Sequence, residues 1–217
     1  MDTGRPEPPG PLSLSAQLRA RTRDLHTQAE RSGIMRALLR GDVQRAAYVL
    51  LLRNLHAIYA ALEAALEAHA AHPLIAPLYD PLLWRRRPLE QDLDALHGAE
   101  WRDLAITPTT RDYVIVVTAA NPATLVAHAY VRYLGDLSGG QILARIVQAS
   151  LQLEGTAGSE FYRFATPDAG ALAQRFRRQL DGIPVNAALA AIIVGEARRS
   201  FSMHVRLFEE LAVAPPS

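Results

Sequence analysis

The feature that most constrains the fold is the helical spacing of apolar positions along almost the whole chain. They recur at steps of three and four residues, first at Leu14, Leu18, Thr22, Leu25 and Ala29, which is the period of one face of an α-helix. Residues 113–117, YVIVV, would favour a strand by propensity, but no second run of similar character is present to pair with them. The sequence therefore predicts an all-α fold.

Proline, glycine and capping residues divide this pattern into successive helices. The first begins at Ser13 and stops at Ser32-Gly33, and Asp42 is the expected N-cap of the second. Residues 1–11 contain four prolines and two glycines with little to bury, so we expect a disordered tail there, a single domain over 12–213 and a short tail over 214–217. From the second onward, helices are expected over 42–71, 88–97, 109–120, 121–153, 168–181 and 185–213.

The amino-acid composition excludes several kinds of catalytic and metal-binding site. The 217 residues include no cysteine, and all 23 basic residues are arginine, so there is no thiolate metal site, no cysteine nucleophile and no Schiff-base lysine. Codon usage is the simpler origin of both absences. The formal net charge of +1 gives no reason to expect nucleic acid or an anionic membrane as the main partner. Without a signal-peptide core or about 18 uninterrupted apolar residues, the chain is expected to be soluble and cytoplasmic.

Two segments carry unusual side chains. Arg19, Arg23, His26 and Glu30 are spaced by four, three and four residues, so they share one helical face. An imidazole can bind a metal while a carboxylate holds its other nitrogen, and the guanidinium groups can bind anions. A solvated face with an incidental histidine explains this helix alone at least as well.

The second segment, residues 130–141, places three glycines inside a long expected helix. Each interior glycine costs about 1 kcal/mol relative to alanine. Gly135 and Gly139 are four residues apart and leave one helical face bare, against which a flat ligand can lie. Close helix packing and a kink are the alternatives.

Taken together, these segments resemble the heme oxygenases. The runs LRARTRDLHTQAE at 18–30 and LVAHAYVRYLGDLSGGQ at 125–141 are similar to the two signature segments of that family, with further similarity in AIYAALEAAL at 57–66, PLEQDL at 88–93 and FEEL at 208–211. The resemblance covers residues 12–211. It implies a single-domain helical bundle in which haem is sandwiched between a proximal helix and a kinked, glycine-rich distal helix.

The resemblance also implies roles for individual residues. His26 matches the proximal iron ligand, and Glu30 matches the carboxylate associated with it. The matched haem contacts, which include the propionate contacts and two aromatic residues of the last helix, are Arg19, Arg23, Tyr130, Arg177, Phe201 and Phe208. On the distal side, the matched glycines, the aspartate that orders water and the members of its network are Gly135, Gly139, Asp136, Arg132 and Tyr59.

Two positions depart from the family pattern. Ala173 stands where a second basic propionate residue is common, and His204 stands where asparagine is expected. Both concern how haem is oriented. The remaining histidines, His56, His69, His72, His97 and His128, are interpreted as surface or packing residues without a second convincing partner. The run Arg85-Arg86-Arg87 is interpreted as a solvated surface; docking of an acidic electron donor together with Arg175, Arg177 and Arg178 is the alternative.

The implied activity is oxidative cleavage of haem b, which is both substrate and cofactor, at a meso carbon, with alpha favoured. The products are biliverdin, CO and ferrous iron, and the reaction uses O2 and an electron donor such as ferredoxin or a flavin reductase. A monomer without a membrane anchor is expected, with a bilin-binding protein as a candidate downstream partner. The main alternative is a non-catalytic haem storage or delivery protein, which has no need of Asp136. A ferritin-like di-iron bundle would need Glu-x-x-His pairs and a thiaminase-like protein a cysteine, and the sequence contains neither.

Overall fold

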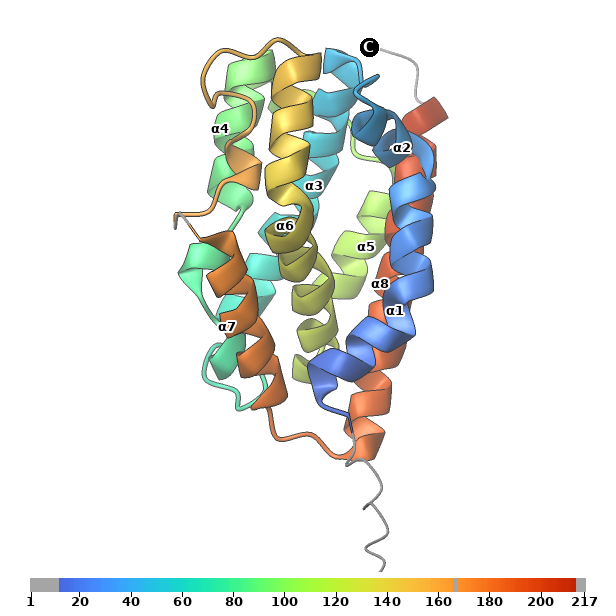
Figure 1. Ribbon diagram of the computed structural model, residues 1–217, viewed down its shortest axis with the longest axis vertical. Helices are drawn as coiled ribbons and strands as arrows, with labels where there is room; N and C mark the ends of the chain where they lie inside the picture. The colour runs from blue at the N-terminus through green and yellow to red at the C-terminus, as the bar shows by residue number, and fades with distance from the viewer. Residues whose placement is uncertain (1–11, 166–167, 214–217) are drawn as a thin grey trace, which may run out of the picture.

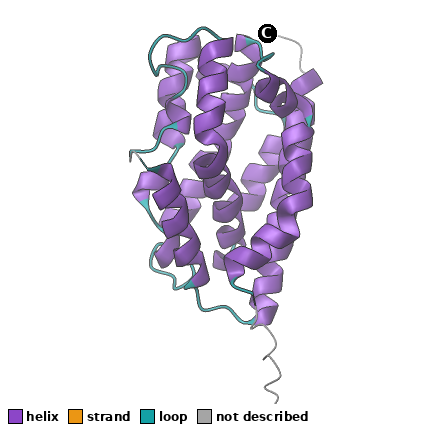
Figure 2. Ribbon diagram, in the orientation of Figure 1, coloured by secondary structure: helices purple, strands orange, loops and turns teal. Residues whose placement is uncertain are grey.

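A computed structural model describes residues 12–165 and 168–213, and these residues contain helices but no strand (Figure 2). The all-α prediction is therefore confirmed. The expected tails, residues 1–11 and 214–217, lie outside the described residues. The α-helices are α1 (Leu14–Arg31), α2 (Gly33–Arg40), α3 (Arg45–Ala68), α4 (Arg86–His97), α5 (Pro108–Thr118), α6 (Pro122–Ser150), α7 (Ala169–Asp181) and α8 (Ala187–Val213), with 3-10 turns η1 (Ala76–Leu78), η2 (Pro81–Leu83), η3 (Ala99–Asp103) and η4 (Glu160–Tyr162).

Helices α1 and α6 are held in place by three shared neighbours. Each of α2, α7 and α8 contacts both α1 and α6, and α8 makes the most extensive contacts with the two (Figure 1). Helix α3 packs against α4 and α5 and lies behind α6 in this view. The separation of α1 and α6 is therefore set mainly by the helices that bridge them.

Helix α2 was not predicted from the sequence. Ser32-Gly33 is a sharp joint between two helices and not the end of a helical region. Gly33 has φ +40°, and a Cβ atom there would lie 1.8 Å from the carbonyl oxygen of Phe208, so only glycine allows α2 to approach α8 this closely. Gly41, at φ +78°, ends α2 in the left-handed conformation that glycine favours.

The sequence predicts the start of α3 wrongly and the helical state of α5 correctly. The N-cap prediction for Asp42 was wrong: Asp42 lies in the turn after α2, and α3 begins three residues later at Arg45. The β-branched run in α5 is helical, as predicted. Thr107 starts this helix by accepting a hydrogen bond from the backbone N–H of Thr110, and Tyr113 is buried against the rest of the bundle.

Helix α3 is the central core helix. Among the described residues it is the one helix that is long and apolar enough to cross a membrane by length and composition, yet 56% of its most apolar stretch is buried inside the protein. A helix that is hydrophobic around most of its circumference is typical of a protein core. Its burial inside the bundle accounts for its sequence.

Arg85 is buried, so its interpretation as part of a solvated surface was wrong. Its Nε donates to the carbonyl oxygen of Leu83 at 3.1 Å and its Nη1 to that of Phe161 at 3.3 Å, while the guanidinium carbon lies 4.0 Å from the ring centre of Phe164. Backbone carbonyls can therefore replace the water that burial removes. Arg85 does not contribute to a docking surface.

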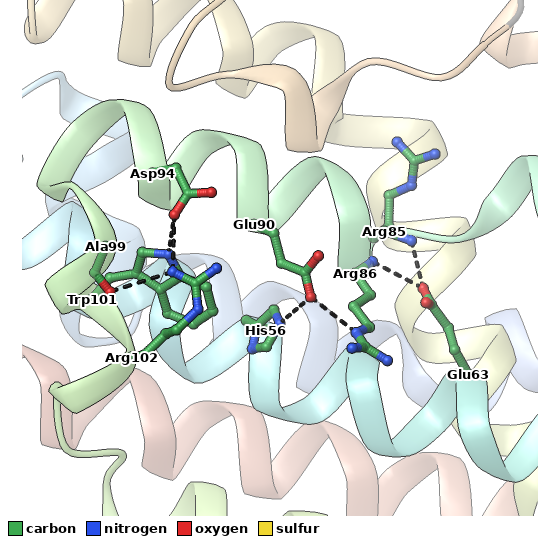
Figure 3. A network of polar contacts seen from close by, with 9 residues as sticks. All are labelled: His56, Glu63, Arg85, Arg86, Glu90, Asp94, Ala99, Trp101 and Arg102. Carbon is green, nitrogen blue, oxygen red and sulfur yellow. Dashed lines mark hydrogen bonds and ion pairs between the residues drawn. The ribbon is translucent and has the colours of Figure 1, made fainter.

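Two of the histidines interpreted as surface or packing residues join neighbouring helices. His56 Nε2 lies 3.2 Å from Glu90 Oε1 and joins α3 to α4 (Figure 3). His128 is fully buried on α6, with its Nδ1 3.2 Å from the hydroxyl of Tyr113 and its Nε2 3.2 Å from Glu196 Oε1 on α8. Both histidines therefore tie helices together.

The start of α4 provides a test of how burial affects stability. Glu63 accepts hydrogen bonds at Oε1 from the backbone N–H groups of Arg85 and Arg86 (Figure 3), and burial raises the pKa of Glu63 to about 7. Between pH 4.5 and 7 the folded chain keeps a proton here that the unfolded chain has lost, so this group lowers the unfolding free energy as pH rises through that window.

We predict that Glu63→Gln, which keeps the Oε1 acceptor but cannot ionise, gains stability relative to the wild type by about 1–3 kcal/mol between pH 4.5 and pH 7.5. Urea denaturation at both pH values measures this gain. A difference between variant and wild type that stays constant with pH would contradict it.

Candidate functional site

A cleft lies between α1 and α6. Its outer part has a volume of about 1070 Å³ and its inner part about 420 Å³. The two parts are continuous because they share lining residues from α1, α6 and α8. The shared residues are His26, Val131, Gly135, Ser138 and Phe201.

His26 of α1 lines both parts of the cleft. Its Nδ1 lies 3.7 Å from Glu30 Oε1 one turn further on, which is an electrostatic contact longer than a hydrogen bond. Its ring meets Phe201 of α8 edge-on, with 5.8 Å between ring centres. A carboxylate on the Nδ1 side favours a proton there, which leaves Nε2 available to bind a metal.

Positive side chains surround the outer part of the cleft. Arg19 and Arg23 of α1 and Arg177 of α7 line it together with Tyr130 of α6. Burial raises the pKa of Tyr130, and a hydrogen bond to Thr22 and the nearby charges of Arg177 and Arg19 oppose this. The mouth is therefore suited to anionic groups such as carboxylates.

The positive mouth of the cleft is asymmetric between its two walls. Among the described residues of α7, Arg177 alone lines the cleft. Ala173, one turn earlier, is buried. The α7 wall therefore offers a single guanidinium group, whereas the α1 wall offers two.

The three glycines of α6 differ in their surroundings. A Cβ atom added at Gly135 or Gly139 would have no neighbouring atom within 4 Å, whereas at Gly140 it would lie 3.4 Å from the carbonyl oxygen of Tyr162. Close packing therefore explains neither Gly135 nor Gly139, and at Gly140 a Cβ atom would be in ordinary van der Waals contact. At Gly135 and Gly139 the bare helix backbone borders open space in the cleft, which a flat ligand can fill.

A network of buried polar side chains lies behind the inner part of the cleft. Arg132 Nη2 donates to Asp136 Oδ1 at 3.2 Å and Arg132 Nε to the Tyr59 oxygen at 3.1 Å, and the Tyr59 hydroxyl donates to Asp136 Oδ2. Arg132 Nη1 lies 3.0 Å from His204 Nε2. The structure thus brings together Tyr59 of α3 with Arg132 and Asp136 of α6, as the sequence predicts, and adds His204 of α8 to the network.

Burial controls the protonation of this network. It raises the pKa of Asp136, against the opposing effect of Arg132, and it holds the pKa of His204 well below its usual value, with the Arg132 charge acting in the same direction. His204 is therefore neutral at ordinary pH. Its Nδ1–H donates to the carbonyl oxygen of Ser200 at 2.9 Å, so Nε2 is the acceptor for Arg132.

Some lining residues were not identified from the sequence. Phe201 and Phe208 line the inner part as expected, but Met35 and Leu39 also do, and they belong to the unpredicted α2. The signal was present in the run 33–40, which is rich in helix-forming residues and followed by glycine. For Ser138 no sequence signal distinguishes it from other helical serines.

The cleft suits haem. An imidazole lies on one wall, bare helix backbone on the other, and guanidinium groups at the mouth for two carboxylates. A family model described as heme oxygenase matches residues 12–210. The chain is 37% identical over 204 residues to heme oxygenase 1 of Nostoc, covering 92% of this chain and 86% of that protein.

Solved structures agree with this match. The crystal structure of heme oxygenase-1 from Synechocystis in complex with heme has a TM-score of 0.87 and 38% identity, covering 92% of each chain. Heme oxygenase from Leptospira interrogans has a TM-score of 0.88 and 33% identity over 92% of this chain and all of that one. The chain belongs to the heme oxygenase family, whose members are enzymes that cleave haem to biliverdin.

The open space beside Gly135 gives a direct test of the haem wall. Gly135→Ala should stabilise the haem-free protein by about 0.5–1 kcal/mol, because alanine favours a helix, and should weaken haem binding, because the methyl group occupies the cleft. Gly195→Ala is the control, since Gly195 lies on α8 away from the cleft and its Cβ would also have no neighbour within 4 Å. Urea denaturation should show that both variants are stabilised equally. Haem titration should show weaker binding for Gly135→Ala alone. Equal haem affinities of the two variants would contradict the assignment of Gly135 to the wall that haem contacts.

Proposed function

We propose that this chain cleaves haem at a single meso carbon, with alpha favoured, to give biliverdin, CO and ferrous iron. O2 and reducing equivalents are consumed, the latter from a donor such as ferredoxin or a flavin reductase. The observation that carries this proposal is the Asp136–Arg132–Tyr59 network, which borders the same cleft as His26 and the open glycines. Haem storage or delivery has no use for a buried carboxyl poised beside the ligand.

The walls of the cleft bind haem and orient it. In this proposal His26 binds the iron through Nε2, with Glu30 holding the proton on Nδ1, and haem supplies the redox chemistry when bound. Arg19, Arg23 and Arg177 fix the propionates and so decide which edge of the macrocycle faces the inner part of the cleft. The bare backbone at Gly135 and Gly139 lets the macrocycle lie against α6.

The inner network supplies protons. Asp136, whose pKa is raised by burial, holds a water molecule and exchanges a proton at a carboxylate oxygen. Arg132 keeps this carboxylate in place at Oδ1, and Tyr59 does so at Oδ2. His204 accepts from Arg132 and thereby fixes the direction of its guanidinium plane.

The remaining features of the proposal concern the setting of the enzyme. We propose a cytoplasmic monomer that meets its acidic electron donor at exposed arginines outside the cleft, Arg86 and Arg87 of α4 and Arg178 of α7. Both iron release and supply of biliverdin to a bilin-binding protein would use the same cleft.

The activity is tested by binding haem to the purified protein, adding a reductase system in air, and recording spectra and CO release. Loss of the haem Soret band with formation of biliverdin is expected. His26→Ala should lower the rate by about 100-fold or more, because the haem loses its fixed position, and added imidazole should restore part of it. His97→Ala, which changes an exposed histidine at the end of α4, is the control and should match the wild type. A protein that binds haem but leaves it intact would support the storage alternative instead.

The proton role of Asp136 is tested by separating binding from turnover. Asp136→Asn should bind haem about as tightly as the wild type but form biliverdin about 10²–10⁴-fold more slowly, because it cannot exchange a proton. Asp112→Asn, which changes an exposed residue of α5, is the control. Thermal unfolding of the haem-free variants checks that Asp136→Asn still folds as stably as the wild type, as expected if the amide oxygen still accepts the hydrogen bond from Arg132. A normal biliverdin yield from folded Asp136→Asn would remove Asp136 from the reaction.

A further inference from the structure

The first turn of α1 is tied to the last residue of α7. The backbone N–H of Ser15 donates to Asp181 Oδ1 at 2.8 Å, and the Ser15 hydroxyl donates to Asp181 Oδ2 at 2.9 Å. Both carboxylate oxygens are thus used on one residue, 166 positions away along the chain. We call this pair of hydrogen bonds the Ser15–Asp181 clamp.

The position of Asp181 is unfavourable within its own helix. A carboxylate in the last turn of a helix lies at the negative end of the helix dipole, whereas one at a helix start is favourable. Asp181 ends α7 but lies at the start of α1, whose own first turn contains no acidic residue. The interaction that stabilises this carboxylate is therefore the one between the two helices.

The two residues of the clamp lie one helical turn from the arginines at the mouth of the cleft. Ser15 lies one turn before Arg19 on α1, and Asp181 lies one turn after Arg177 on α7. Ser15, Arg19 and Arg177 all line the outer part of the cleft. Each half of the clamp therefore lies directly beside an arginine of the mouth, one on each wall.

The α7 wall needs this support. Arg177 is the single cleft-lining residue among the described residues of α7, since Ala173 supplies no second charge. The other polar tie of α7 in this region joins Arg175 to Asp80, away from α1. Among the described residues, the clamp is the one side-chain hydrogen-bond tie between α7 and α1.

We infer that Asp181 is a positioning residue for haem: by clamping the start of α1 it fixes the distance between Arg19 and Arg177, and so fixes how the macrocycle is rotated in its plane. This inference rests on the proposed function. It assigns to Asp181, which does not line the cleft, an effect on which meso edge is presented. The α7 side then needs one arginine and one clamp in place of two basic side chains.

The test compares Asp181→Ala with Asp181→Asn. The amide of Asn can accept from the Ser15 N–H and donate to its hydroxyl, so it should restore the clamp that Ala removes. Glu67→Ala is the matched control, because Glu67 is an exposed acid in the last turn of α3 and far from α7 in the sequence. The double variant Ser15→Ala/Asp181→Ala shows whether the two residues act together.

Three measurements are made on each protein: the dissociation constant of ferric haem by Soret titration, the haem methyl signals of the cyanide complex by NMR, and the biliverdin isomers from one turnover. We expect Asp181→Ala to weaken haem binding about three- to tenfold, to add methyl signals absent from the wild type, and to give a mixture of isomers. Asp181→Asn and Glu67→Ala should match the wild type, and the double variant should be no worse than Asp181→Ala.

A folded Asp181→Ala protein with wild-type affinity, methyl signals and isomer would overturn the inference, as would weaker binding that Asn fails to restore. If the wild type binds haem without cleaving it, the proposed function fails. The affinity and NMR measurements would still decide whether the clamp positions haem.

Discussion

The inner half of the cleft depends on one buried ion pair, between Arg132 and Asp136 on successive turns of α6. Burying two charges costs more than their attraction returns unless further hydrogen bonds satisfy them. Tyr59 supplies these from α3, and His204 supplies an acceptor from α8. Three helices must therefore keep their mutual positions for the pair to stay buried. The buried pair therefore constrains how α3, α6 and α8 pack around it.

The cleft exists because its two walls are held apart by other helices. Helices α2, α7 and α8 bridge α1 and α6, and the small residues at the contacts decide how closely each can approach. Gly33 lets α2 touch the backbone of α8. By contrast, a Cβ atom at Gly135 or Gly139 would have no neighbouring atom within 4 Å. Glycine thus closes one interface and opens one surface within the same bundle.

The sequence was sufficient for most of the helical architecture, because the period of the apolar residues is a local property. Spacing also places His26 and Glu30 on one face of α1, but a solvated face explains that spacing equally well, and the resemblance to the heme oxygenases was what grouped the residues of α1 with those of α6. Contacts between distant segments could not be predicted from the sequence. Arg85 looks like part of a solvated run, and its burial depends on carbonyl groups near residue 161. The partners of His56 and His128 lie 34 and 68 residues further on, and no spacing rule connects them.

Helix α8 touches both faces of the haem position proposed here. Phe201 packs its ring against His26, and His204, three residues further on and so on the same side of the helix, holds Arg132. Between them runs less than one turn of rigid backbone, about 4.5 Å along the axis. The proposed iron ligand and the proposed proton-supplying network thus share contacts with one helix, so a small slide or rotation of α8 displaces both together. Substitutions at packing positions of this helix should therefore change ligand geometry and proton delivery in concert, even where they touch neither.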